Sequence, residues 1–208
     1  MTRMGLLSWV TLAIALTSTP ACAQDSTNAR AWAFDASLWG YIVPDDDDVL
    51  SPIFIADRHW LHLEGRYNYE APKTGSAWFG YNFSFGSAVT VDITPMVGAV
   101  IGGLTGAAPG YELSIDWWKL NLANDGEYVF DFGDRENDFF YVWSQLGISP
   151  VDWLQLGVSV QRTRAYQTER DIQRGFFAEV TWRSLYFSTF VFNPDDPPTV
   201  ILAIGASF

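Results

Sequence analysis

The feature that most constrains this chain is a repeated alternation of apolar and polar residues in segments of about ten residues. The segment 154–161, for example, reads Leu-Gln-Leu-Gly-Val-Ser-Val-Gln, and residues 76–85 and 176–183 alternate in the same way. Successive side chains of a β-strand point to opposite faces, so each segment predicts a strand with one apolar face. Glycine, proline, aspartate and asparagine separate the segments, as expected for turns. We therefore predict an all-β protein.

A soluble β-sandwich also alternates, but two features favour a membrane barrel. The segments are long enough to cross a bilayer at a tilt, and longer than most sandwich strands. Aromatic residues make up 16% of the chain and recur at the ends of the apolar faces, as in an interfacial girdle. A sheet in lipid must close on itself, because an open edge leaves backbone groups unsatisfied. The predicted fold is a transmembrane antiparallel up-and-down β-barrel.

The number of strands follows from the turn residues that separate the alternating segments. We expect twelve, at 31–42, 49–56, 60–70, 75–85, 88–101, 110–122, 126–132, 138–148, 153–165, 173–183, 185–193 and 199–208. An even number places both chain termini in the periplasm, with tight periplasmic turns and longer outer loops. Asn124-Asp125-Gly126 is one expected tight turn. Pro52 weakens the second strand and 126–132 is short, so ten strands remain an alternative.

The first 23 residues predict a cleaved signal peptide. The apolar run from Gly5 to Leu16 is too short to span a bilayer as a helix. Ala21-Cys22-Ala23 then gives the small-x-small pattern of a cleavage site. Two alternatives are an N-terminal membrane anchor and a lipoprotein modified at Cys22. Cleavage after Ala23 leaves residues 24–208 as a single barrel domain without cysteine.

The last ten residues, Thr-Val-Ile-Leu-Ala-Ile-Gly-Ala-Ser-Phe, alternate and end in Phe208. This segment resembles the terminal strand of bacterial outer-membrane β-barrel proteins of Gram-negative cells. The resemblance implies that the barrel-assembly machinery reads Phe208 as an assembly signal, and that the protein resides in the outer membrane. It is a likeness at the level of the class, and it carries over no binding or catalytic residue.

The polar faces of the strands predict what lines the barrel. The charged lumen candidates are His62, Glu64, Arg66, Asp92, Glu112, Asp116, Glu127, Asp131, Glu179 and Arg183. We favour an acidic, porin-like pore for small polar solutes or ions. The alternative is a non-conducting structural or surface-interaction barrel, with Glu64, Arg66, Glu179 and Arg183 in ion pairs that plug the lumen. Twelve strands lie between small filled barrels and wide porins, so both hypotheses stand.

The chain carries a formal net charge of -12. It lacks the cations needed to release counterions from nucleic acid, so we expect no nucleic-acid partner. The expected partners are outer-membrane lipids and lipopolysaccharide. Arg162, Arg164 and Arg170 are candidates for phosphate contacts. The acidic runs 45–48 and 193–198 are expected in outer loops.

An enzyme acting on lipids is the least favoured function. His62 is the one candidate base, with Ser84 or Ser159 as nucleophile only if folding brings them together. His59 and His62 are three residues apart, hence on opposite faces of a strand, and cannot share a metal. We predict no cofactor, no metal site and no catalytic residue.

Overall fold

The computed structural model describes residues 31–44, 47–165 and 171–208. The expected signal peptide lies outside these residues. The strands are β1 Ala33–Ile42, β2 Val49–Arg58, β3 Leu61–Tyr67, β4 Thr74–Tyr81, β5 Phe83–Gly86, β6 Val89–Gly102, β7 Gly106–Trp117, β8 Leu120–Asp131, β9 Phe139–Val151, β10 Leu154–Ala165, β11 Asp171–Trp182, β12 Leu185–Phe192 and β13 Thr199–Ser207. A short 3₁₀ helix, η1, spans Arg135–Asn137. Among the described residues no helix is long and apolar enough to cross a membrane.

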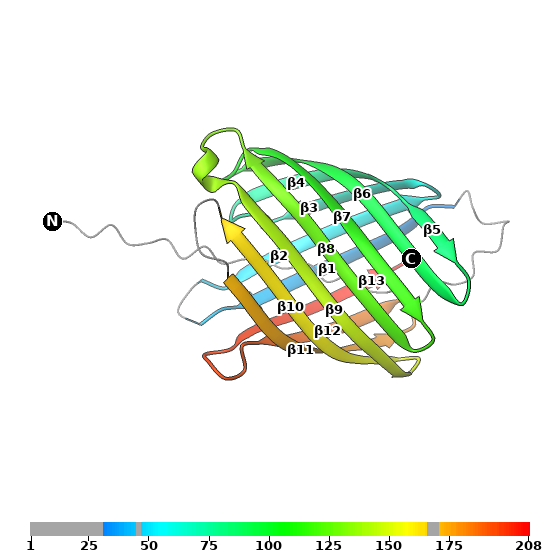
Figure 1. Ribbon diagram of the computed structural model, residues 1–208. Coiled ribbons are helices and arrows are strands. Elements are labelled where there is room, and N and C mark those ends of the chain that lie inside the picture. Colours follow the sequence, from blue (N-terminus) through cyan, green and yellow to red (C-terminus); the bar gives the residue numbers. More distant parts are fainter. Residues whose placement is uncertain (1–30, 45–46, 166–170) are drawn as a thin grey trace.

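The sheet is antiparallel and closes into a barrel of twelve strands (Figure 1). β4 and β5 both pair with β6, so they act as one strand interrupted at Asn82. β1 pairs with β13, and Phe34 and Phe208 exchange two backbone hydrogen bonds of 2.8 and 2.9 Å at that seam. The twelve-stranded prediction is confirmed, and the ten-stranded alternative is wrong. Pro52 lies within β2 where β3 no longer pairs with it, because that pairing begins at Ile53.

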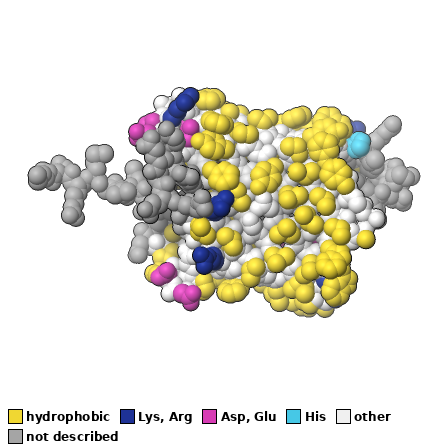
Figure 2. Space-filling view, in the orientation of Figure 1, with side chains coloured by type: hydrophobic (Ala, Val, Ile, Leu, Met, Phe, Trp, Pro, Cys, Tyr) yellow, Lys and Arg dark blue, Asp and Glu magenta, His cyan; other side chains and the backbone are white. Residues whose placement is uncertain are grey.

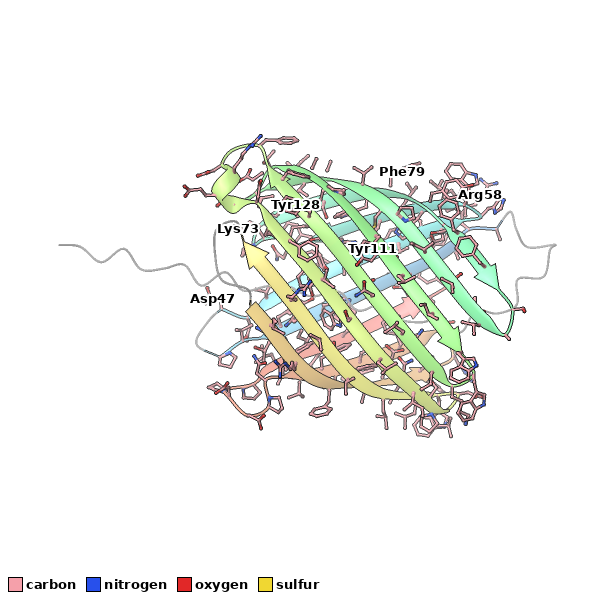
Figure 3. All side chains as sticks on the ribbon, viewed as in Figure 1. Asp47, Arg58, Lys73, Phe79, Tyr111 and Tyr128 are labelled. Carbon is pink, nitrogen blue, oxygen red and sulfur yellow. The ribbon has the colours of Figure 1, made fainter. Side chains whose placement is uncertain are left out.

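The connections at the two ends of the barrel differ in length. At one end, here called the turn end, the β2–β3, β5–β6, β7–β8, β9–β10 and β11–β12 connections are two residues each. At the loop end the described connections run from three to seven residues and include η1 (Figure 1). Figure 3 places Asp47 and Lys73 at the loop end and Arg58 at the turn end. Tight turns at one end and longer loops at the other are the asymmetry that is typical of outer-membrane barrels.

One predicted hairpin is misplaced. Asn124-Asp125-Gly126 lies within β8, and the turn is instead at Trp118 and Lys119, with Trp118 at a φ of 56°. Tyr111 of β7 explains why: its ring covers Gly126, where a Cβ would lie 2.6 Å from the ring. The Tyr111 hydroxyl also donates a 2.7 Å hydrogen bond to the Asn124 side chain. Cross-strand contacts therefore satisfy residues whose local preference is a turn.

The outer wall of the barrel is apolar. Phe79, Val97, Leu146 and Ile204 are each about half exposed, as expected for side chains that face lipid. Figure 2 shows apolar side chains over most of the visible wall, with acidic side chains at the end that carries η1. Exposed tryptophans gather next to the tight turns: Trp60, Trp117, Trp118, Trp153 and Trp182. They form the interfacial aromatic girdle that the sequence predicted.

Candidate functional site in the barrel lumen

The lumen has an apolar part and a charged part. The wall from β9 through β13 to β2 contributes most of a buried cluster, here called the aromatic cluster. Its members are Trp39, Tyr41, Ile53, Tyr69, Tyr141, Trp143, Phe177, Phe190, Phe192, Ile201 and Ala203. The wall from β3 through β8 contributes the buried charged residues His62, Glu64, Arg66, Glu112, Asp125 and Glu127.

The aromatic cluster reaches across the lumen. Trp143 of β9 makes edge-to-face contacts with Phe190 and Phe192 of β12, with ring centroids 5.0 and 5.3 Å apart. β10 and β11 lie between these two strands in the sheet, so the contacts span the interior. Trp39 and Trp143 are each only 1% exposed. The interior at this level is packed by side chains, which the prediction of a polar pore did not include.

Arg66 of β3 is the centre of the charged part. Its Nη2 lies 2.6 Å from Glu64 Oε2, and its Nη1 lies 3.0 Å from Glu127 Oε2 on β8. The guanidinium is sandwiched between Tyr69 and Trp78, with Cζ 4.5 Å from each ring centroid. Two carboxylates and two aromatic faces thus replace the water that this buried cation has lost.

Glu70 joins this group from the β3–β4 loop. Its Oε1 accepts hydrogen bonds from Ser76 Oγ and, at 3.3 Å, from Trp78 Nε1. Arg66 Nη1 is 4.0 Å away. Burial raises the pKa of Glu70 above its ordinary value, and Arg66 opposes this increase only in part.

His62 is held by a chain of hydrogen bonds near the turn end. Its Nδ1 donates to Asp57 Oδ1 at 2.9 Å. Asn82 also donates to Asp57, at 2.7 Å, and accepts a 2.7 Å bond from Thr94. The interruption between β4 and β5 therefore places Asn82 where it supports the Asp57–His62 pair. His59 lies in the adjacent turn and is exposed.

Most of the predicted lumen residues do face inward. His62, Glu64, Arg66, Glu112, Glu127 and Glu179 are buried at 8% exposure or less. Asp92 and Asp116 share the inward faces of their strands and are partly exposed towards the turn end. Asp131 lies at the mouth of the loop end, where it accepts hydrogen bonds from Gly133 and Asn137.

The prediction that Arg183 faces the lumen is wrong. It lies in the β11–β12 turn with a φ of 58°, is exposed, and stacks on Trp182 instead of entering the lumen. Arg183 therefore takes no part in the ion pairs of the plugged-barrel alternative, and Glu179 accepts a 2.7 Å hydrogen bond from Ser188. A tight turn of two residues ends the strand alternation one residue earlier than the sequence pattern suggests.

Sequence reasoning missed two buried acids, Glu70 and Asp125, the partly exposed Asp57 and the aromatic cluster. Asp125 was expected in a tight turn, and Asp57 and Glu70 were not among the predicted lumen residues. Phe190 and Phe192 lie in a segment that is apolar on both faces, 185–192, and this could have signalled a packed interior. Ser84 is exposed on β5, and His62 contacts Asp57 and Glu64, so the proposed serine–histidine pair with Ser84 is not formed.

The comparisons with known proteins agree with this architecture. No protein-family model and no curated protein matches the sequence. A solved structure of KdgM porin superposes with a TM-score of 0.63 at 10% sequence identity, covering 84% of this chain and 99% of that one. KdgM porin in complex with disordered oligogalacturonate gives a TM-score of 0.60, again at 10% identity, covering 85% and 99%. By its closed twelve-stranded antiparallel sheet and this likeness, the chain has the β-barrel fold seen in KdgM porin.

Proposed function

We propose that the protein is a porin-like channel for small polar solutes or cations, with Arg66 and its carboxylate partners at the constriction. The observation that carries the proposal is a twelve-stranded barrel, similar in fold to KdgM porin, whose β3–β8 wall presents charged side chains to the lumen. In a lipid-exposed barrel, buried charge is retained where it serves passage or selectivity.

The excess of carboxylates in the lumen indicates which solutes the channel would admit. Arg66 is the one arginine or lysine that faces the lumen among the described residues. The inward carboxylates are Asp35, Asp57, Glu64, Asp92, Glu112, Asp116, Asp125, Glu127 and Glu179. An acidic lumen concentrates cations and repels anions. We therefore expect passage of cations and of neutral polar molecules such as short uncharged oligosaccharides, and discrimination against acidic ones.

A second candidate function is a non-conducting barrel. It is favoured by the aromatic cluster, in which Trp39, Trp143 and Phe190 are at most 1% exposed. A lumen packed in this way without rearrangement leaves no path for a hydrated solute. Such a barrel would act through its surface loops.

Single-channel recording in planar bilayers separates the two. Discrete cation-selective steps from the folded protein support the channel, and Arg66→Gln is then expected to change conductance and selectivity. A silent wild type together with a conducting Trp143→Ala variant would instead identify a plugged barrel and overturn the channel proposal. Heat-dependent gel mobility checks that each variant is folded.

We further propose lipopolysaccharide and the barrel-assembly machinery as partners. Arg162 on β10 is partly exposed near the loop end, 5.9 Å from the Phe140 ring, in reach of headgroup phosphates. The side chains of Arg164 and Arg170 lie outside the described residues. Phe208 lies where β1 and β13 close the barrel, and its backbone hydrogen bonds to Phe34 do not depend on its side chain. If the assembly machinery reads the Phe208 ring, Phe208→Ala is expected to slow assembly in cells while the folded barrel remains stable.

A further inference from the structure

We propose that His62 and Glu64 of β3, with Glu112 of β7, bind a divalent transition-metal ion such as Zn²⁺ inside the barrel. One ligand atom from each residue lies within 4.8 Å of the other two. All three side chains are buried, at 2, 4 and 8% exposure. The proposal is independent of whether the barrel conducts.

Each of the three residues has a buried polar atom without a hydrogen-bond partner. His62 Nε2, Glu64 Oε1 and Glu112 Oε1 are buried without a hydrogen bond. Such groups carry a desolvation cost unless something satisfies them. A metal ion bound between the three residues would give these side chains the partner that they lack.

The charge of the region also calls for a cation. Glu64, Glu70, Glu112, Asp125 and Glu127 are all at most 9% exposed. Arg66 pairs with Glu64 and Glu127, which leaves Glu112 without an ion-pair partner among the described residues. A buried carboxylate in this position needs a proton or a counter-ion, and a divalent ion next to Glu64 and Glu112 provides one.

The histidine is oriented as metal-binding histidines are. Asp57 accepts the Nδ1 proton at 2.9 Å, which leaves the Nε2 lone pair directed into the cluster. A protonated Nε2 would have Glu64 Oε2 as its acceptor, but at 3.7 Å that contact is too long for a hydrogen bond. Asn82 and Thr94 hold Asp57 in place, so the imidazole has a complete supporting shell.

A glycine in the wall between the ligands leaves space for them to approach each other. β4 and β6 separate β3 from β7, and Gly80 of β4 faces the lumen opposite His62. A Cβ at Gly80 would lie 2.9 Å from Thr94 Cγ2 and 3.2 Å from His62 Cβ. Glycine thus leaves room for His62 to extend towards Glu112. Asp57, next to His62 at the turn end, is 37% exposed in its side chain.

The ligand set selects the class of ion. One imidazole nitrogen with two carboxylates suits Zn²⁺ and its neighbours, whereas Ca²⁺ and Mg²⁺ take oxygen ligands. Three protein ligands leave a further coordination position for water. His59 takes no part, because it lies in the exposed turn.

The test is isothermal titration calorimetry of the folded protein in detergent, without a histidine tag and after chelator treatment. We expect one Zn²⁺ per chain and much weaker Ca²⁺ binding. Glu112→Gln and His62→Gln should each weaken Zn²⁺ binding by at least about tenfold, and Asp57→Asn by about 10–100-fold. Glu179→Gln, a buried glutamate outside the cluster, is the matched control and should bind as the wild type does.

Two results would overturn the proposal. One is the absence of stoichiometric Zn²⁺ binding by protein shown to be folded. The other is binding that His62→Gln and Asp57→Asn both leave unchanged. Cobalt substitution adds a second readout, because loss of the nitrogen ligand in His62→Gln must alter the Co²⁺ absorption spectrum.

Discussion

Arg66 of β3 and Glu127 of β8 meet inside the barrel with 3.0 Å between Nη1 and Oε2, although 61 residues separate them in sequence. Three strands of the closed wall, counting β4 and β5 as one, lie between β3 and β8. The Arg66 side chain is completely buried. The pair therefore links two distant parts of the wall through the lumen.

Arg66→Met should destabilise the barrel. It leaves Glu64 and Glu127 buried without a cation, a change that typically costs about 3–5 kcal/mol. Urea unfolding in micelles, followed by tryptophan fluorescence, measures the loss. The triple variant with Glu64→Gln and Glu127→Gln should recover part of it. A single variant as stable as the wild type would show that the ion pairs are not formed.

Glu70→Gln should change how stability depends on pH. Because burial raises the pKa of Glu70, the folded protein holds this proton more tightly than the unfolded chain does. Stability is therefore lost as pH rises from the ordinary glutamate value through the raised one. The glutamine variant keeps an acceptor for Ser76 and lacks this loss, so its advantage over the wild type should grow with pH. Glu136→Gln, in the exposed η1, is the control and should leave the profile unchanged.

Tyr111→Ala should weaken the β7–β8 pairing. It uncovers Gly126 and removes the hydroxyl that binds Asn124, on the face of β7 opposite to that of the buried Glu112. We expect a loss of about 1–3 kcal/mol in unfolding free energy. Tyr111→Phe keeps the ring and should lose about 1 kcal/mol. Equal stability of both variants with the wild type would contradict the role assigned to Tyr111.

Arginine on the outer wall should cost more at mid-strand than at the rim. Val97 lies near the middle of β6 and Ile101 near its loop end, and both side chains face outward. Val97→Arg is expected to destabilise the barrel in lipid by about 2–4 kcal/mol, and Ile101→Arg by about 0–1 kcal/mol. Unfolding titrations in bilayers measure both variants. Equal costs would place the membrane elsewhere on the wall.

The sequence by itself determined the class of fold. Alternation has a period of two in every strand, so it fixed which face of β10 or β13 meets lipid, and tight turns fixed the number of strands. It also identified His62, Glu64, Arg66, Glu112 and Glu127 as lumen residues, because inward positions follow from parity alone.

Only the tertiary structure decided what these residues do together. Glu112 lies near His62 although β4 and β6 separate their strands, with Gly80 beside His62, and no local pattern encodes that approach. The turn preference of Asn124-Asp125-Gly126 was overridden by Tyr111 on a neighbouring strand. Arg183 left the lumen because a two-residue turn ended its strand. The alternation of side chains is a local property of the backbone, so the sequence alone determined which residues face the lumen. Contacts across a closed barrel depend on how all twelve strands tilt and pair, so only the tertiary structure determined which of these residues meet.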